Sequence, residues 1–126
     1  MPNKWLKSLF QFAAAYDFIL GLLFFFFFKS IYNSFGVPLP NHDGYVQFAA
    51  LLVMILGIGF WFVSQDPLRN RDIIKMGILL KTAYFGTVFY HSIFGVIPFV
   101  WVPFAWIDLG FCALFVWALQ TPITKA

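Results

Sequence analysis

Long runs of apolar residues follow one another along the chain, separated by short polar stretches. The first run ends where Lys29 and Ser30 lead into a loop rich in glycine and proline, and the second ends at prolines and charges between Ser64 and Arg71. A short turn at 95–98 divides the third run from the fourth. The pattern predicts four helices at approximately 5–28, 45–63, 73–94 and 99–119.

Each run has the roughly 20 residues that an α-helix needs to cross a hydrocarbon core about 30 Å thick. The strands of a membrane β-barrel would alternate polar and apolar residues, but residues 20–28 and 48–60 are apolar at nearly every position. The first run also continues past Asp17 without the polar cleavage region of a secretory signal. We therefore predict an all-α membrane protein in which residues 1–126 form one four-transmembrane-helix bundle.

The composition supports a membrane location and excludes several classes of protein. Of 126 residues, 62% are hydrophobic and only 10% are charged, whereas a soluble domain has about a quarter charged residues. Soluble enzymes are therefore disfavoured. The 8 lysines and arginines are scattered and form no basic stripe, so we expect no nucleic-acid partner.

The basic residues other than Lys81 are distributed unequally between the two ends of the predicted bundle. Only Lys29 falls at one end. At the other end lie Lys4, Lys7, Arg69, Arg71, Lys75 and Lys125. By the positive-inside rule, both termini and the middle loop are expected to be cytoplasmic. Aromatic residues near the predicted helix ends, among them Tyr32, Tyr45 and Trp101, are typical of the headgroup region.

Three charged residues, Asp17, Lys81 and Asp108, lie inside the first, third and fourth predicted spans. Each costs about 2.5–3.5 kcal/mol at the middle of a membrane helix. Counted from the cytoplasmic ends of their spans, the three residues lie at similar depths. We therefore predict that they form one buried ionic cluster. Because two carboxylates would surround one ammonium group, we expect one aspartate to exchange a proton.

Residues spaced by three and four positions place the charged residues on faces with small side chains. In the third span, Tyr84 shares the face of Lys81, so we add Tyr84 to the candidate ligand-binding or proton-relay residues. The predicted inward faces are Ala14, Asp17 and Gly21; Gln47, Ala50, Met54 and Gly57; Gly77, Lys81, Tyr84, Val88 and His91; and Trp101, Ala105, Asp108 and Cys112. A purely structural role, in which the charges fix helix register, remains an alternative.

The other candidate residues give weaker indications of function. We interpret His91, near the end of its span, as a hydrogen-bonding residue of the interface rather than as a haem ligand. His42, Asp43 and His91 are too dispersed in the sequence to predict a metal site. Cys112, the only cysteine, is expected to be a small buried packing residue. No catalytic residues are predicted, and no cofactor can be named.

Several short motifs between Tyr16 and Leu119 resemble those of small bacterial four-helix membrane proteins of the DoxX-like type. They are the Gly-Val-Pro-Leu-Pro loop at 36–40, the Gln47–Gly59 span with its Gly57-Ile58-Gly59-Phe60 sequence, the Asp66-Pro67-Leu68-Arg69 turn, Gly77 with Lys81, and Asp108. The resemblance implies a bacterial cytoplasmic membrane and an association with quinone-related or thiol-oxidant membrane complexes. Cys112 alone cannot supply the dithiol for thiol oxidation.

Three functions are compatible with these features. The first is a small accessory or ligand-binding membrane protein, whose polar cluster binds an amphipathic molecule such as a lipid or a quinone. The second is a proton-coupled transporter of a small molecule. The third is a structural subunit of a larger cofactor-bearing membrane complex. The expected partners are membrane lipids and either further copies of the chain or the subunits of such a complex.

Overall fold

The computed structural model describes residues 4–121, which contain the helices α1 (Lys4–Ser34), α2 (Asp43–Gln65), α3 (Arg71–Phe94) and α4 (Trp101–Gln120). Each helix is long and apolar enough to cross a membrane. The predicted all-α membrane fold with four transmembrane helices is therefore confirmed. The helix α1 extends beyond the predicted end at residue 28. Its backbone departs from helical dihedral angles at Phe27 (φ −125°, ψ 17°), and the helix then continues to Ser34.

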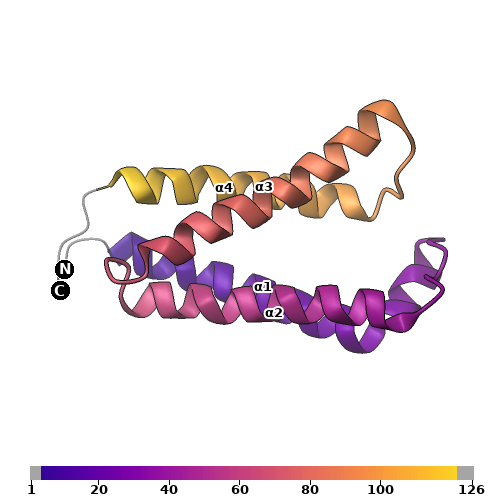
Figure 1. Cartoon of the computed structure of the whole chain (residues 1–126), viewed down its shortest axis with the longest axis horizontal. Helices are drawn as coiled ribbons and strands as arrows, with labels where there is room; N and C mark the ends of the chain where they lie inside the picture. Colours follow the sequence, from indigo (N-terminus) through magenta and orange to yellow (C-terminus); the bar gives the residue numbers. More distant parts are fainter. Residues whose placement is uncertain (1–3, 122–126) are drawn as a thin grey trace.

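The helices form two hairpins, α1 with α2 and α3 with α4, joined by the short turn at 66–70 (Figure 1). The helix α3 lies near α2 beside this turn, and its other end diverges from α2. Aromatic rings connect α1 to α4 along much of their length, from Trp5 against Trp117 to Tyr32 against Trp101. We call the half of the bundle next to the 66–70 turn the closed half and the other half the open half.

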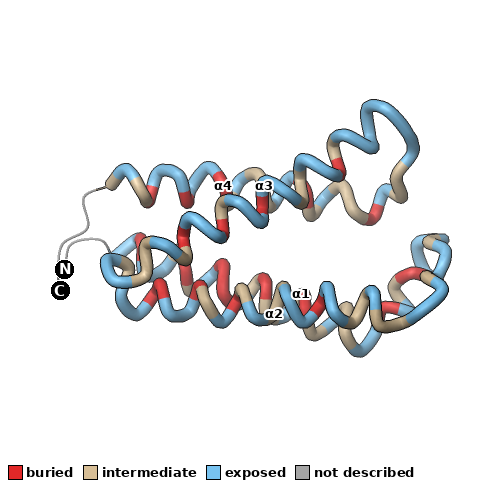
Figure 2. Tube along the Cα trace, in the orientation of Figure 1, coloured by how far each residue is buried: buried red, intermediate tan, exposed pale blue. Residues whose placement is uncertain are grey.

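The hydrophobic core lies in the closed half and takes side chains from all four helices. At its centre the rings of Phe10, Phe60 and Phe115 pack together, with centroids 4.8–6.0 Å apart. We call these three residues the phenylalanine triad. All three are fully buried. Figure 2 shows buried positions on the facing sides of the helices and exposed positions on their outer sides, as expected where lipid surrounds a bundle.

Two glycines allow α1 and α2 to approach closely. A Cβ atom at Gly57 would lie 2.9 Å from the backbone nitrogen of Phe18 and 3.0 Å from the carbonyl oxygen of Ala14. A Cβ atom at Gly21 would overlap with Met54 and would lie 2.7 Å from the carbonyl oxygen of Ala50. Small residues at such contacts let membrane helices gain van der Waals packing. The predicted inward faces of α1 and α2 are therefore the faces that meet.

Polar contacts fix the turn that joins the hairpins. The backbone N–H of Arg69 donates to Oδ1 of Asp66 (3.1 Å), and the side-chain amide of Asn70 donates to the carbonyl oxygens of Phe62 and Asp66 (3.0 Å each). The Arg71 guanidinium then donates to the carbonyl oxygen of Leu119 at 2.7 Å, near the end of α4. These bonds connect the starting end of α3 with the last turns of α2 and α4.

The start of α1, the 66–70 turn and the end of α4 lie at one end of the bundle (Figure 1). This end therefore holds the described basic residues that the positive-inside rule places in the cytoplasm, whereas Lys29 lies toward the other end of α1. Lys125 lies outside the described residues. The orientation of the protein in a membrane stays a prediction. At the opposite end, the His42 side chain accepts a hydrogen bond from the backbone N–H of Gly44 (2.9 Å) and caps the start of α2.

Candidate functional site

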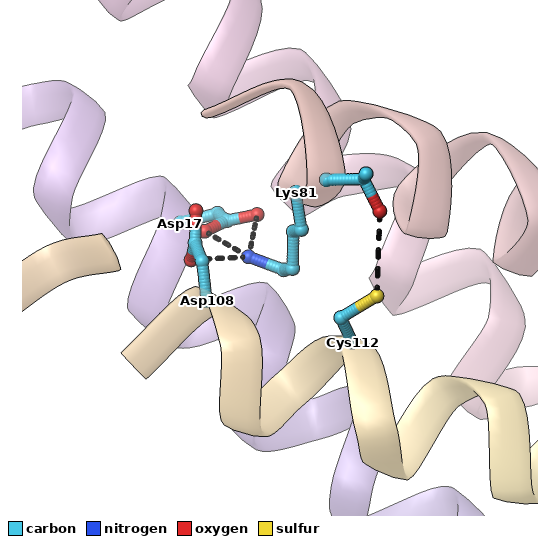
Figure 3. Close-up of polar contacts among 5 residues, drawn as sticks. Asp17, Lys81, Asp108 and Cys112 are labelled. Atoms are coloured by element: carbon cyan, nitrogen blue, oxygen red, sulfur yellow. Dashed lines mark hydrogen bonds and ion pairs between the residues drawn. The ribbon is translucent and has the colours of Figure 1, made fainter. Parts of the chain in front are cut away.

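The three charged residues that were predicted to cluster do lie together (Figure 3). The ammonium group of Lys81 on α3 donates to Oδ1 of Asp108 on α4 at 2.9 Å. It also contacts both carboxylate oxygens of Asp17 on α1, at 3.3 and 3.5 Å. We call these three residues the ionic cluster. Their proximity follows the similar depths that the sequence predicts.

Burial differs among the members of the ionic cluster. The exposed fraction of the side chain is 2% for Lys81 and 5% for Asp17, but 14% for Asp108. A buried ion pair of this kind is stable only when its hydrogen bonds replace the lost hydration. Lys81 meets this condition through both carboxylates, and Asp108 is the member most accessible from outside the cluster.

Aromatic rings surround the ammonium group of Lys81 on its remaining sides. Its nitrogen lies 5.1 Å from the ring centroid of Phe111 and 5.7 Å from those of Tyr16 and Phe60. Distances below about 6 Å allow cation–π attraction. These aromatic partners are not among the residues predicted from the sequence. The signal that could have found Tyr16 is its position immediately before Asp17, but Phe60 and Phe111 are two of 19 phenylalanines.

A cleft of about 370 Å³ begins at the ionic cluster and extends into the open half. All four helices line it, and its walls are mainly apolar and aromatic. The lining residues with exposed side chains, Tyr45, Ala49 and Leu80, belong to α2 and α3. The cleft therefore opens between these two helices, where α3 diverges from α2 (Figure 1).

The predicted site residue Tyr84 also lines this cleft, together with Asp17, Lys81 and Asp108. The Tyr84 hydroxyl does not bond to the charged groups; it donates to the carbonyl oxygen of Trp101 at 2.9 Å and connects α3 to the start of α4. Tyr84 is therefore a wall residue that contributes an aromatic surface. The four predicted site residues are all brought to one cleft, although only three of them bond to each other.

Three aromatic residues near the helix ends, Tyr32, Tyr45 and Trp101, line the cleft, and two of them pack together. Tyr32 is buried, and its ring packs edge to face on Trp101 with centroids 5.6 Å apart. Both residues line the cleft. The spacing that places Trp101 on the same face as Asp108 already indicated this position for Trp101. No such signal existed for Tyr32, because the break at Phe27 changes the direction of the helix before it.

On the other side of the ionic cluster the bundle is closed. Phe10 and Phe115 each lie about two helical turns from the aspartate on their own helix, toward the 66–70 turn. A Cβ atom at Gly77 would lie 2.5 Å from the Phe60 ring, so this glycine makes room for the phenylalanine triad. The ionic cluster is therefore accessible from the open half and sealed by packed rings toward the closed half.

Other candidate residues lie apart from this cleft. His91 is exposed, although its spacing placed it on the inward face of α3. His91 lies near the end of α3, where this helix has diverged from α2. Cys112 is buried, as expected, and its sulfur lies 3.5 Å from the Thr82 hydroxyl. Within residues 4–121, no three histidine, cysteine, aspartate or glutamate side chains are grouped as metal ligands.

Searches among protein-family models, curated proteins and solved structures found no match to this chain. The resemblance to DoxX-like proteins therefore rests on the short motifs alone and stays a prediction. The candidate site is defined by its geometry: a cleft in a four-helix membrane bundle that ends at a buried aspartate–lysine–aspartate cluster.

Proposed function

We propose that the protein is a small ligand-binding membrane protein whose cleft holds an amphipathic molecule, such as a lipid or a quinone. The observation that carries this proposal is that the cleft combines an apolar and a polar environment. Apolar and aromatic walls lead to a polar end formed by the ionic cluster. A molecule with a polar group and a hydrophobic chain matches both environments.

The size and position of the cleft support such a ligand. Its volume of about 370 Å³ is at the lower end of the roughly 300–1,000 Å³ typical of small-molecule sites. The volume suits a polar group with one chain or ring better than a complete two-chain lipid. Because Ala49 and Leu80 at the opening lie inside membrane-spanning segments, an apolar molecule would enter from the surrounding hydrocarbon.

Proton-coupled transport has less support than binding. A transporter must expose its site to the two sides of the membrane in turn. The fully buried phenylalanine triad separates the ionic cluster from the end of the bundle at the 66–70 turn. Transport would require these packed rings to separate, whereas binding requires only the cleft that is already formed.

Mass spectrometry of molecules that copurify with the protein tests the proposal. Ala49 lines the cleft, so Ala49→Trp should fill it and remove the bound molecule. Ala113→Trp is the matched control, because Ala113 is also exposed on a membrane helix but does not line the cleft. We expect one amphipathic species with the wild type and with Ala113→Trp, and its loss with Ala49→Trp. Equal amounts in all three samples would refute a role for the cleft.

A further inference from the structure

The polar end of the cleft offers carboxylate acceptors, because the ammonium group of Lys81 is already occupied. The ammonium group of Lys81 contacts three carboxylate oxygens and faces three aromatic rings. Only 2% of the Lys81 side chain is exposed. An entering molecule therefore cannot use Lys81 as a donor without breaking the ionic cluster.

The carboxylate of Asp108 has capacity for a further partner. Its Oδ1 accepts from Lys81, and its Oδ2 has no hydrogen-bond partner among residues 4–121. Asp108 is also the most exposed member of the ionic cluster and lines the cleft. An ionised carboxylate can accept several hydrogen bonds, so this oxygen is available to a donor in the cleft.

A second polar atom near the same end is also unsatisfied. The Tyr16 hydroxyl is buried and has no hydrogen-bond partner in the described part of the chain, and Tyr16 lines the cleft. A buried polar group without a partner costs about 1–3 kcal/mol. The hydroxyl itself is enclosed by the protein, so a molecule in the cleft reaches Asp108 and not this oxygen.

The charge of the site favours a cation. With both aspartates ionised, the ionic cluster carries one net negative charge, so a cation in the cleft would take the place of the proton that one aspartate is expected to exchange. No other Lys, Arg, Asp or Glu side chain of residues 4–121 lines the cleft. A positive group would neutralise this charge in an apolar environment, where such interactions are strong. The cleft walls contain aromatic faces, including Tyr84 and Trp101, that also attract cations.

From these observations we infer that the cleft selects a single-chain amphipathic amine, with its protonated amino group at Asp108 and its chain between α2 and α3. The inference rests on the proposed function and narrows the class of ligand. A quinone or a fatty acid presents acceptors to the carboxylates and lacks the donors that they require. The phosphate of a phospholipid headgroup would bring a second negative charge to the same end.

Three probes with the same ten-carbon chain test this selectivity: decylammonium, decanol and decanoate. Equilibrium dialysis would measure their binding to the protein in nanodiscs of zwitterionic lipid, with empty nanodiscs subtracted. We expect decylammonium to bind about tenfold or more tightly than decanol, which is the size of one charge-assisted hydrogen bond. Decanoate should bind more weakly than decanol.

Substitutions at the polar end separate the contributions to amine selectivity. Asp108→Asn keeps the shape of the side chain and leaves Lys81 paired with Asp17, so the protein should fold and the preference for decylammonium over decanol should disappear. Tyr16→Phe removes a hydroxyl that is enclosed by the protein and should leave the preference for decylammonium unchanged. Ala113→Trp should leave all three affinities unchanged.

The outcomes distinguish this inference from the proposed function. If decanol or decanoate binds as tightly as decylammonium, and Ala49→Trp abolishes that binding, the amine selectivity is wrong although the cleft binds ligands. If none of the three probes binds above the level of empty nanodiscs, both proposals fail. If the preference for decylammonium persists in Asp108→Asn, the assignment of the amino group to Asp108 is overturned.

Discussion

The closed and open halves of the bundle use the same kinds of residue for opposite purposes. In the closed half, phenylalanine rings from three helices pack against one another and are fully buried. In the open half, aromatic residues such as Phe24 and Phe104 line a cleft and are only partly buried. The ionic cluster lies where the two halves meet. An aromatic-rich composition therefore does not determine whether a region is a core or a site; the separation of α2 and α3 decides that.

This comparison predicts different costs for removing an aromatic ring from each half. Phe115→Ala should lower the free energy of unfolding by about 3 kcal/mol, because it leaves a cavity at the centre of the phenylalanine triad. Phe104→Ala is the matched change on the same helix, and it should cost about 1 kcal/mol or less because its ring faces the cleft. Denaturant unfolding in detergent micelles would measure both. Equal losses would show that the open half is packed as tightly as the closed half.

The second prediction concerns the junction of the two halves. Lys81→Met should cost about 2–3 kcal/mol, because it leaves two buried carboxylates without a counter-charge. Combining it with Asp108→Asn should cost less than the sum of the two single changes, since a single carboxylate then remains. The matched control is Lys75→Met, which removes an exposed lysine paired with Asp72. The same unfolding assay would measure the cycle, and additive losses would contradict a coupled cluster.

The sequence predicts the ionic cluster because depth and face are both encoded along single helices. Positions counted from the helix ends place Asp17, Lys81 and Asp108 at one level, and steps of three and four residues direct them inward. The cleft could not be predicted in the same way, because it depends on the angle between α2 and α3. That angle is set by contacts between different helices, and no periodicity along one helix reports it.

The phenylalanine triad could not be predicted from the sequence either. The triad takes one residue from α1, one from α2 and one from α4, and nothing in the sequence distinguishes Phe10, Phe60 and Phe115 from the other phenylalanines. Gly77 gave a partial signal, because a small residue beside Lys81 indicates close packing. The structure adds the partner: the ring of Phe60 occupies the space that a side chain at Gly77 would need.

The smallest predicted effect comes from adding one methyl group at either of two glycines on α3, which differ in how closely they are packed. Gly77→Ala places a Cβ atom 2.5 Å from the buried Phe60 ring, so it should destabilise the protein by about 1–2 kcal/mol through overpacking. Gly86 lies farther along α3, and a Cβ atom there would have no neighbouring atom within 4 Å, so Gly86→Ala should be neutral or slightly stabilising. Thermal unfolding of the two variants would compare them. A loss for Gly86→Ala equal to that for Gly77→Ala would contradict the divergence of α3.

The break in α1 at Phe27 affects whether a molecule reaches the cleft from the lipid or from water. Beyond this residue, Phe28 and Tyr32 are buried, and Tyr32 packs on Trp101 at the start of α4. Tyr32 and Trp101 cover the side of the cleft toward the loop end of α1, and the exposed lining residues Ala49 and Leu80 lie within helices that can span a membrane. A molecule in the cleft would therefore equilibrate with the lipid phase. Its occupancy would follow its mole fraction in the membrane rather than its concentration in water, so weak intrinsic affinity would suffice for a strongly partitioning compound.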